Sequence, residues 1–439
     1  MLYEIPKIMK QNPSKWPIGI CGVPARLPDG SGTLIPVLES TNYLVLGMTG
    51  HGKTVFTKAV AHGLLDNVPE SLGVFFQIKP DDFTLEFMHP GDKVISYSSP
   101  TIPDNSVFQW NMVKEIRQSP DHEAELRRLG NSLFSHLLED DRNRLWAGAA
   151  RDTFIGFLRV IVDCYRDCPS NGAVIKSLRS LNIVSLLKYL SKHPRNHSLI
   201  RNSFGFDPRT PNASYTPPRK AEDIMFFLND VLETFSGNYA SAEGADTISD
   251  FLHGRSGRNL FIQHDLSQEE ASRPFELYFL RKIIEDKMSP STDVKKTLVM
   301  ILDEADKCGG DFGATKAATL GRGYGLQMII STQSLESLYA LSPEKNREHT
   351  TNALTSGFPV IAAFHGGDAN TITTLQALFG SRRKEITAMG ISRYASPITK
   401  SELEPIVTDS DFASLDVGQA FIKIMSHPPQ KVTIIHISN

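Results

Sequence analysis

One octapeptide restricts the fold of this chain more than any other feature: Gly47-Met48-Thr49-Gly50-His51-Gly52-Lys53-Thr54. It matches the pattern G-x-x-x-x-G-K-[ST] at every fixed position. An apolar run at 43–46 precedes it, and a stretch at 55–65 with apolar residues at helical spacing follows it. A strand, a glycine-rich loop and a helix in this order predict a phosphate-binding loop at the edge of a parallel sheet.

The loop also predicts how a nucleotide would be held. Glycines let consecutive backbone N–H groups curl around a phosphate, and the helix N-terminus adds partial positive charge. Lys53 would reach the β- and γ-phosphates of ATP, and the Thr54 hydroxyl would bind Mg²⁺. His51 is expected to act through its backbone alone. The predicted nucleotide-binding residues are Thr49, Gly50, His51, Gly52, Lys53, Thr54 and Val55.

A second acidic motif complements the loop. The apolar run 298–302 ends in Asp303-Glu304, which has the form of a Walker B strand. Asp303 would hold Mg²⁺ through its water shell, and Glu304 would polarise the water that attacks the γ-phosphate. Buried strands often end in acidic turns, so this motif gains its meaning from the loop at 47–54. Together the two motifs predict hydrolysis of ATP as well as binding.

Two further residues are candidate catalytic groups. Gln333 ends the apolar run 326–332, which a right-handed crossover would place beside the strand that ends at Asp303. A sensor of the γ-phosphate and a strand-end turn residue are both consistent with its position. Arg322 lies in Gly321-Arg322-Gly323-Tyr324-Gly325 and could be an arginine finger for a neighbouring subunit or a surface arginine.

The texture of the chain predicts an α/β fold with a mostly parallel central sheet, of the RecA-like P-loop NTPase type, and an inserted all-α domain. Apolar residues recur at helical spacing from about 114 to 245, with a helix start at Ser119-Pro120 and a loop at 202–219. The predicted segments are 1–113 (first part of the nucleotide-binding domain), 114–245 (all-α) and 246–439 (second part). Strands are expected at 43–46, 73–78, 259–263, 297–302, 326–332 and 359–364, with an antiparallel pair at 419–425 and 431–437.

Composition adds few restrictions. The formal net charge of −3 lacks a global polycationic signature, so any contact with nucleic acid must be local. The four cysteines form no CxxC pair, which favours reduced thiols of a cytoplasmic protein over a zinc site. No apolar run reaches the ~18 residues that a membrane span needs.

The order of these motifs resembles the coupling-protein ATPases of conjugation and type IV secretion, the TraD/TraG type within the FtsK/HerA class of ring translocases. The resemblance covers most of the chain from about residue 42. Gln77 and Met112 depart from it, because they stand where the family usually has Asp and Pro. The matching stretches are Tyr43 to Thr54, Phe75 to Asp82, Trp110-Asn111, Leu145 to Arg151, Asp303-Glu304, Gly321 to Leu326 and Ser331 to Leu338.

This resemblance implies a homo-hexameric ring at the cytoplasmic face of the inner membrane. The ring would hydrolyse ATP with Mg²⁺ between subunits and pass DNA, single-stranded or bound to a relaxase, to a secretion channel. Relaxosome and channel proteins would be its partners. Arg322 and Gln333 take their finger and sensor roles from the same resemblance. Family members usually carry N-terminal transmembrane helices, whereas this chain reaches its phosphate-binding loop after only about forty residues. We therefore expect either a shortened form of a membrane-anchored protein, with the anchor outside this chain, or a soluble variant.

Three alternatives remain at this stage. Asp303-Glu304-Ala305-Asp306 spells the helicase signature DEAD, but its separation from Lys53 is too large for one compact helicase domain. The second alternative is an ATPase that powers protein secretion or pilus assembly without nucleic acid. A scaffold that binds nucleotide without hydrolysis would not need Glu304.

Overall fold

The computed structural model describes most of the chain in two compact units, which interleave in sequence. The first unit comprises residues 1–71, 297–307 and 314–439, and the second comprises 72–296 and 308–313. The predictions at 80–82, at 436–437 and within 208–214 lie outside the described residues. These are 21–68, 70–79, 83–98, 104–139, 141–207, 215–241, 244–338, 347–388 and 398–435.

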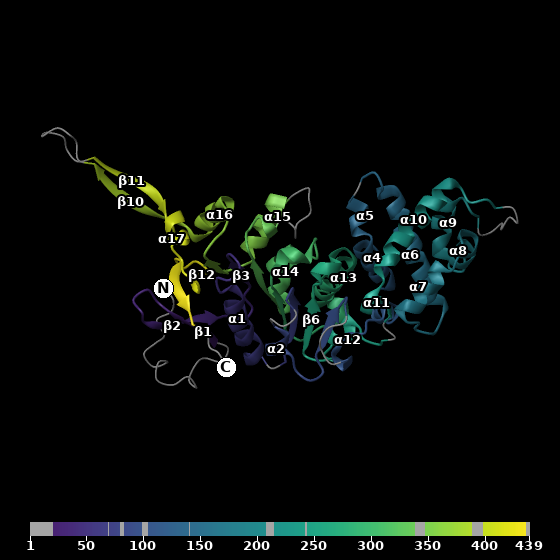
Figure 1. Ribbon diagram of the computed structural model, residues 1–439, viewed down its shortest axis with the longest axis horizontal. Helices are drawn as coiled ribbons and strands as arrows, with labels where there is room; N and C mark the ends of the chain where they lie inside the picture. Colours follow the sequence, from purple (N-terminus) through teal and green to yellow (C-terminus); the bar gives the residue numbers. More distant parts are fainter. Residues whose placement is uncertain are drawn as a thin grey trace. The chain divides into compact units, whose positions relative to one another are not determined.

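The first unit is built on a mixed sheet with the strand order β2-β1-β13-β12-β9-β3-β8-β7 (Figure 1). Its strands are β1 (Cys21–Arg26), β2 (Gly32–Val37), β3 (Tyr43–Leu46), β7 (Leu298–Leu302), β8 (Leu326–Thr332), β9 (Val360–Phe364), β12 (Gln419–Ile424) and β13 (Gln430–Ile434). Its helices are α1 (Lys53–Asn67), α14 (Ala314–Leu320), α15 (Arg347–Ser356), α16 (Ala369–Phe379) and α17 (Asp409–Ala413).

The four strands β9, β3, β8 and β7 pair in parallel and carry the predicted motifs. All four are buried along their whole length, as apolar runs between helices require. Helix α1 packs against β1, β3, β7 and β8 and buries Phe56, Val60 and Leu64. Gly63 allows the helix to approach β2, because a Cβ there would lie 2.9 Å from Val37 Cγ2.

The antiparallel side of this sheet was predicted only in part. Strands β12 and β13 form the expected antiparallel pair, and β12 also pairs with β9. Strands β1 and β2 were missed, because Pro24 and Pro36 interrupt them and break the apolar alternation. A separate hairpin, β10 (Ser381–Ala388) with β11 (Ile398–Pro405), was also missed. The two strands contain many charged residues, so they lack the alternation of apolar and polar residues by which a strand is predicted.

The second unit contains a parallel sheet with the order β4-β6-β5. Its strands are β4 (Leu72–Gln77), β5 (Lys93–Ser96) and β6 (Asn259–Gln263), and helices α2 (Thr84–Phe87), α12 (Ile248–Leu252) and α13 (Glu269–Lys287) flank them in sequence. The structure confirms the expected strands near 73–78 and at 259–263. Strand β5 has only four residues and gave no recognisable pattern.

Between Met112 and Ser241 the described elements are helices or 3-10 turns. The helices are α3 (Met112–Gln118), α4 (His122–Leu133), α5 (Ser135–Glu139), α6 (Arg144–Cys164), α7 (Asn171–Arg179), α8 (Ile183–Leu190), α9 (His197–Phe204), α10 (Arg219–Thr234) and α11 (Gly237–Ser241). The predicted helix start at Ser119 is wrong. Asp121 caps α4 instead, since its Oδ1 accepts a hydrogen bond from Ala124 N at 3.0 Å, and Ser119 follows the end of α3. The predicted loop at 202–219 begins later than expected, because α9 continues to Phe204.

A fully buried lysine joins three helices of this unit. Lys282 Nζ on α13 lies 3.5 Å from Glu115 on α3, 3.0 Å from Glu125 on α4 and 2.7 Å from Asp286. Burial alone would lower the pKa of Lys282, but these carboxylates outweigh burial and raise it. Removal of one member would leave an unpaired buried charge, so the cluster fixes how α13 packs against α3 and α4.

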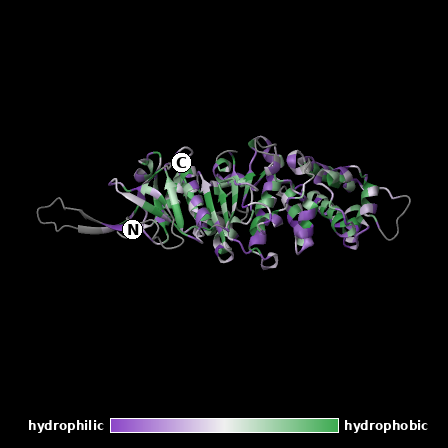
Figure 2. Cartoon of the chain, turned by 90° about the horizontal axis from the view of Figure 1, so that it is seen from below, coloured by the Kyte–Doolittle hydropathy of each residue, from purple (hydrophilic) through white to green (hydrophobic). Residues whose placement is uncertain are grey.

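The hydropathy of the strands differs from that of the helices (Figure 2), because the strands are more deeply buried. Figure 2 shows the sheet strands as predominantly hydrophobic, while the helices carry both hydrophobic and hydrophilic residues. Such helices cover a core with one face and meet solvent with the other. Among the described residues no helix has the length and apolarity to cross a membrane.

Candidate nucleotide-binding and catalytic site

The loop between β3 and α1 has the backbone that its glycines predict. Gly47, Gly50 and Gly52 have φ values of 145°, 84° and 106°, which side-chain-bearing residues rarely adopt. A Cβ on Gly47 would lie 2.7 Å from Phe364 Cβ, so this position also lacks space for a side chain. A Cβ on Gly50 would meet no atom within 4 Å. The loop is therefore tightly packed at its start and open in its middle.

Three backbone hydrogen bonds hold the loop in place. Gly47 N donates to the carbonyl of Thr332 at the end of β8 (3.3 Å), and Met48 N donates to the carbonyl of His365 after β9 (2.9 Å). The carbonyl of His51 accepts from Gly418 N (3.1 Å). The end of β8 and the residue after β9, the two strands that flank β3, thus fix the shape of the loop together with the turn before β12.

Lys53 is the first residue of α1 and is buried, with 6% of its surface exposed. Its Nζ donates to the carbonyl of Gly47 at 2.7 Å, so the side chain folds back over the loop. Thr54 and Val55 follow and are half-buried. No side chain caps the N-terminus of this 15-residue helix, where the first amide groups of a helix point toward a bound anion. An open glycine loop, a lysine and an uncapped helix N-terminus fit a bound phosphate chain.

The sheet brings the ends of three strands to one edge. In the parallel register Leu302 pairs with Ile330, and Leu46 pairs with Thr332. The residues that follow these strands are Asp303, Gln333 and Gly47, and they therefore lie at the same carboxyl edge. Asp303 and Glu304 are half-buried, and Gln333 is exposed. Ligands of open parallel sheets bind at this edge.

Glu304 adopts an unusual backbone conformation, with φ of 51°. A non-glycine residue in the left-handed region costs free energy, and such residues concentrate at functional sites. The surrounding turn maintains it: Lys307 N donates to the Glu304 carbonyl at 2.9 Å, and Thr332 Oγ1 donates to Asp306 Oδ1 at 3.3 Å. The turn that carries Asp303 and Glu304 is thus tied to the end of β8.

The structure does not bring Arg322 to this edge. Its turn (η7, Gly321–Tyr324) precedes β8, and the following Gly325 accepts a hydrogen bond from Leu298 N, the first residue of β7. The side chain is exposed. Strand β8 separates the two edges by seven residues, or roughly 20 Å. Arg322 therefore cannot serve the phosphate loop of its own subunit.

Comparison with known proteins decides the family. The family model described as "Type IV secretion-system coupling protein DNA-binding domain" matches residues 30–435. The chain belongs to this family. The match includes the phosphate-binding loop, the Asp303-Glu304 turn, Arg322 and Gln333, and it confirms the predicted resemblance.

Solved structures of coupling proteins confirm the fold class. The bacterial conjugative coupling protein TrwBdeltaN70 in its unbound form is 17% identical, with a TM-score of 0.70 over 92% of this chain and 87% of that one. Plasmid coupling protein TrwB in complex with ADP and Mg²⁺ is 18% identical, with a TM-score of 0.68 over 92% and 88%. VirB4 of Thermoanaerobacter pseudethanolicus is 15% identical, with a TM-score of 0.50 over 94% and 96%. No curated protein matches the sequence.

Sequence reasoning about this coupling-protein family member missed the segment after β9. His365 accepts the Met48 N–H, and its ring stacks on His51 with centroids 4.8 Å apart. Gly366 follows with φ of 95°, and a Cβ there would lie 2.1 Å from Met48 Cγ. The only local signal was Gly366-Gly367 directly after an apolar strand, which is typical of a close backbone approach.

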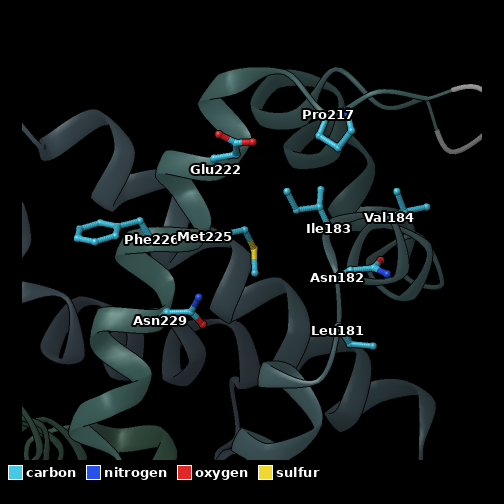
Figure 3. Close-up of a pocket in the computed structure, with 9 residues that line it drawn as sticks. All are labelled: Leu181, Asn182, Ile183, Val184, Pro217, Glu222, Met225, Phe226 and Asn229. Carbon is cyan, nitrogen blue, oxygen red and sulfur yellow. The ribbon is translucent and has the colours of Figure 1, made fainter.

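A separate cavity of about 570 Å³ lies in the helical segment. Met225 of α10 and Ile183 of α8 project into the space between these helices (Figure 3). Glu222 is its charged lining residue, and none of the predicted nucleotide-site residues lines it. The lining residues are Leu181, Asn182, Ile183, Val184, Pro217, Glu222, Met225, Phe226 and Asn229.

Proposed function

We propose that this chain is an ATP-driven motor that moves DNA to a type IV secretion channel. The observation that carries the proposal is the family match over residues 30–435, which includes a phosphate-binding loop and an acidic turn at one sheet edge. As a coupling-protein family member, the chain is a P-loop ATPase that acts with ATP and Mg²⁺ and binds DNA. An ATPase without a nucleic-acid substrate is therefore the less favoured function.

The residues of the loop have distinct roles in this proposal. The backbone from Thr49 to Val55 and the Lys53 ammonium group would hold the phosphate chain. The Thr54 hydroxyl and the Asp303 carboxylate would hold Mg²⁺, which neutralises phosphate charge when bound. Lys53 already lies over the loop through its bond to Gly47, so the ammonium group needs little reorientation to meet a phosphate.

Glu304 and Gln333 would act on the attacking water. Glu304 would accept a proton from it, because a carboxylate at this strand end is the general base that hydrolysis requires. Gln333 would donate to or accept from the water or the γ-phosphate. Its position one residue after Thr332, whose carbonyl binds Gly47 N, supports this sensor role.

Arg322 would act on the nucleotide of a neighbouring subunit. The Arg322 side chain is exposed and lies at the amino end of β8, away from the phosphate-binding loop of the same chain. Both observations support a role in trans, and a homo-hexameric ring would supply the neighbouring subunit. An arginine finger stabilises charge that develops on the transferred phosphoryl group. Turnover would then require assembly, whereas nucleotide binding would not.

The predicted segments fit this motor. We assign 1–113 and 246–439 to the nucleotide-binding domain and 114–245 to an inserted all-α domain, supported by the helices between Met112 and Ser241. The two compact units have other boundaries in the sequence, after residues 71, 296, 307 and 313. The assignment of the three segments therefore rests on the type of secondary structure. The partners would be single-stranded or relaxase-bound DNA, relaxosome proteins and channel proteins at the cytoplasmic face of the inner membrane.

ATP turnover with and without DNA tests the proposal. We expect turnover in the presence of Mg²⁺ and at least a threefold increase on adding single- or double-stranded DNA. Lys53→Ala is the control, because it removes the ammonium group but leaves the fold around α1. No stimulation by either DNA in a hexameric preparation would contradict the DNA motor, and turnover by Lys53→Ala would contradict the site.

A further inference from the structure

A buried threonine connects α16 with the segment that carries Gln333. Thr371 is 1% exposed and lies in the first turn of α16. Its Oγ1 donates to Asp368 Oδ2 at 2.7 Å and accepts a hydrogen bond from Leu335 N at 3.0 Å. Leu335 is itself only 5% exposed, so its amide depends on this acceptor.

The direction of these two bonds is fixed by their chemistry. A hydroxyl has one proton, and Asp368 takes it because an ionised carboxylate only accepts. The oxygen lone pairs of Thr371 then face the Leu335 N–H. Asp368 is held in turn by Thr371 N, which donates to its Oδ1 at 2.9 Å as the cap of α16. The first turn of α16 therefore sets the position of Leu335. Leu335 lies two residues after Gln333 in the sequence.

The same end of α16 is connected to the phosphate-binding loop. His365 and Gly366 hold the loop at Met48, and only Gly367 separates them from the Asp368 cap. A short backbone segment thus joins the residues that hold the loop to the residue that holds Leu335. Asn370 adds a side-chain hydrogen bond to Glu336 from the same turn.

We propose that Thr371 is a positioning residue that fixes the Gln333 segment relative to the phosphate-binding loop. The inference rests on the proposed ATPase function and on Gln333 as its sensor. The hydrogen bonds of Thr371 go to Asp368 and Leu335, so its hydroxyl would affect the hydrolytic step through the Gln333 segment and leave nucleotide binding intact. Loss of the hydroxyl would release the Leu335 amide and let the segment 333–338 move.

Four variants test this role. Thr371→Val keeps the shape and removes both hydrogen bonds, whereas Thr371→Ser keeps the hydroxyl. Thr373→Val is the matched control, because the Thr373 hydroxyl on the same helix is exposed and bonds only to Ala369 in its own helix. Thr371→Ala is a second route to the same effect, since it also removes the hydroxyl that accepts the Leu335 N–H.

The first measurement is amide hydrogen exchange over residues 333–338 in the nucleotide-free chain. We expect Thr371→Val to increase exchange there at least fivefold, with Thr371→Ser and Thr373→Val within twofold of the wild type. Unchanged exchange in Thr371→Val would overturn the positioning role. If Thr371→Val does not fold, Thr371→Ala decides the same question in the same peptide.

The second measurement separates binding from turnover. We expect Thr371→Val to lower kcat about tenfold, to leave the affinity for fluorescent ADP within twofold, and to be rescued by Thr371→Ser. An equal loss of affinity and kcat would overturn the proposal, because it would indicate general disruption of the site. Absence of turnover in the wild type would instead contradict the ATPase function, while the exchange data would still report whether Thr371 holds the segment.

Discussion

The imidazole rings of His51 and His365 stack on each other, with centroids 4.8 Å apart and an angle of 18° between their planes. His51 belongs to the loop before α1, and His365 follows β9, so the stack joins segments more than 300 residues apart in sequence. The His365 carbonyl also accepts the Met48 N–H. One residue therefore holds the loop by its backbone and by its ring.

Replacement of the His365 ring should weaken nucleotide binding. His365→Ala removes the stack but keeps the carbonyl that binds Met48, and an aromatic pair contributes about 0.5–1.5 kcal/mol. We expect the affinity for fluorescent ADP to fall roughly two- to tenfold in a titration. His365→Phe keeps an aromatic ring and should stay within twofold, and an equal loss in both variants would show that stacking is not the cause.

Glu304→Gln should separate binding from hydrolysis. The amide keeps the size of the side chain and the left-handed backbone, but it cannot accept a proton from water. We expect unchanged binding of fluorescent ADP and turnover lower by about 10²- to 10⁴-fold. Asp293→Asn, at an exposed carboxylate before β7, is the control and should change neither value. Full turnover in Glu304→Gln would remove this residue from the mechanism.

Arg322→Ala should lower turnover by at least about tenfold without loss of nucleotide binding, since a finger acts on the transition state. Mixing it with Lys53→Ala subunits should partly restore turnover, because each subunit supplies the group that the other lacks. The measurement is ATPase activity of mixed rings with verified composition. No recovery across mixing ratios would argue against action in trans.

Two glycines of α6 should respond oppositely to alanine. A Cβ on Gly148 would meet no atom within 4 Å, so Gly148→Ala should raise the free energy of unfolding by about 0.5–1 kcal/mol through helix propensity. A Cβ on Gly156 would lie 3.1 Å from Asn196 Oδ1, and the buried Asn196 amide is held by the carbonyls of Gly156 and Leu190. Gly156→Ala should therefore lower the free energy of unfolding by about 1–2 kcal/mol in urea denaturation. A gain in both variants would contradict the packing around Asn196.

Glu123 should contribute to the free energy of unfolding at neutral pH, and this contribution should decrease in acid. The hydrogen bond from Arg159, with Arg195 also near, lowers the pKa of Glu123 from 4.5 to about 2. A lowered folded-state pKa stabilises the fold above the unfolded pKa, and this contribution disappears as pH falls from about 4.5 to about 2. Glu123→Gln should cost about 1–2 kcal/mol in urea at pH 7 and roughly half of that or less at pH 3. Asp141→Asn, at an exposed pair, should change neither value.

The parts of the site that consist of consecutive residues could be predicted from the sequence. The loop at 47–54 and the runs ending at Leu302 and Thr332 carry their own periodicity, so the elements β3, α1, β7 and β8 followed from local pattern. The parallel order of β7 and β8 followed from the rule for right-handed crossovers, and the structure confirms it. The roles of Glu304, Gln333 and Arg322 stay predictions, because no ligand contact tests them.

Local sequence determined the strand–loop–helix unit, the acidic strand end and the helical texture of 114–245, because hydrogen bonds and periodicity within a few residues specify such elements. Tertiary structure alone decided that β9 lies beside β3, that His365 stacks on His51 and that Thr371 holds Leu335. It also placed Arg322 at the far end of β8. Contacts between residues tens or hundreds of positions apart depend on which strands pair and how side chains fill the space between layers, and no local pattern encodes that choice.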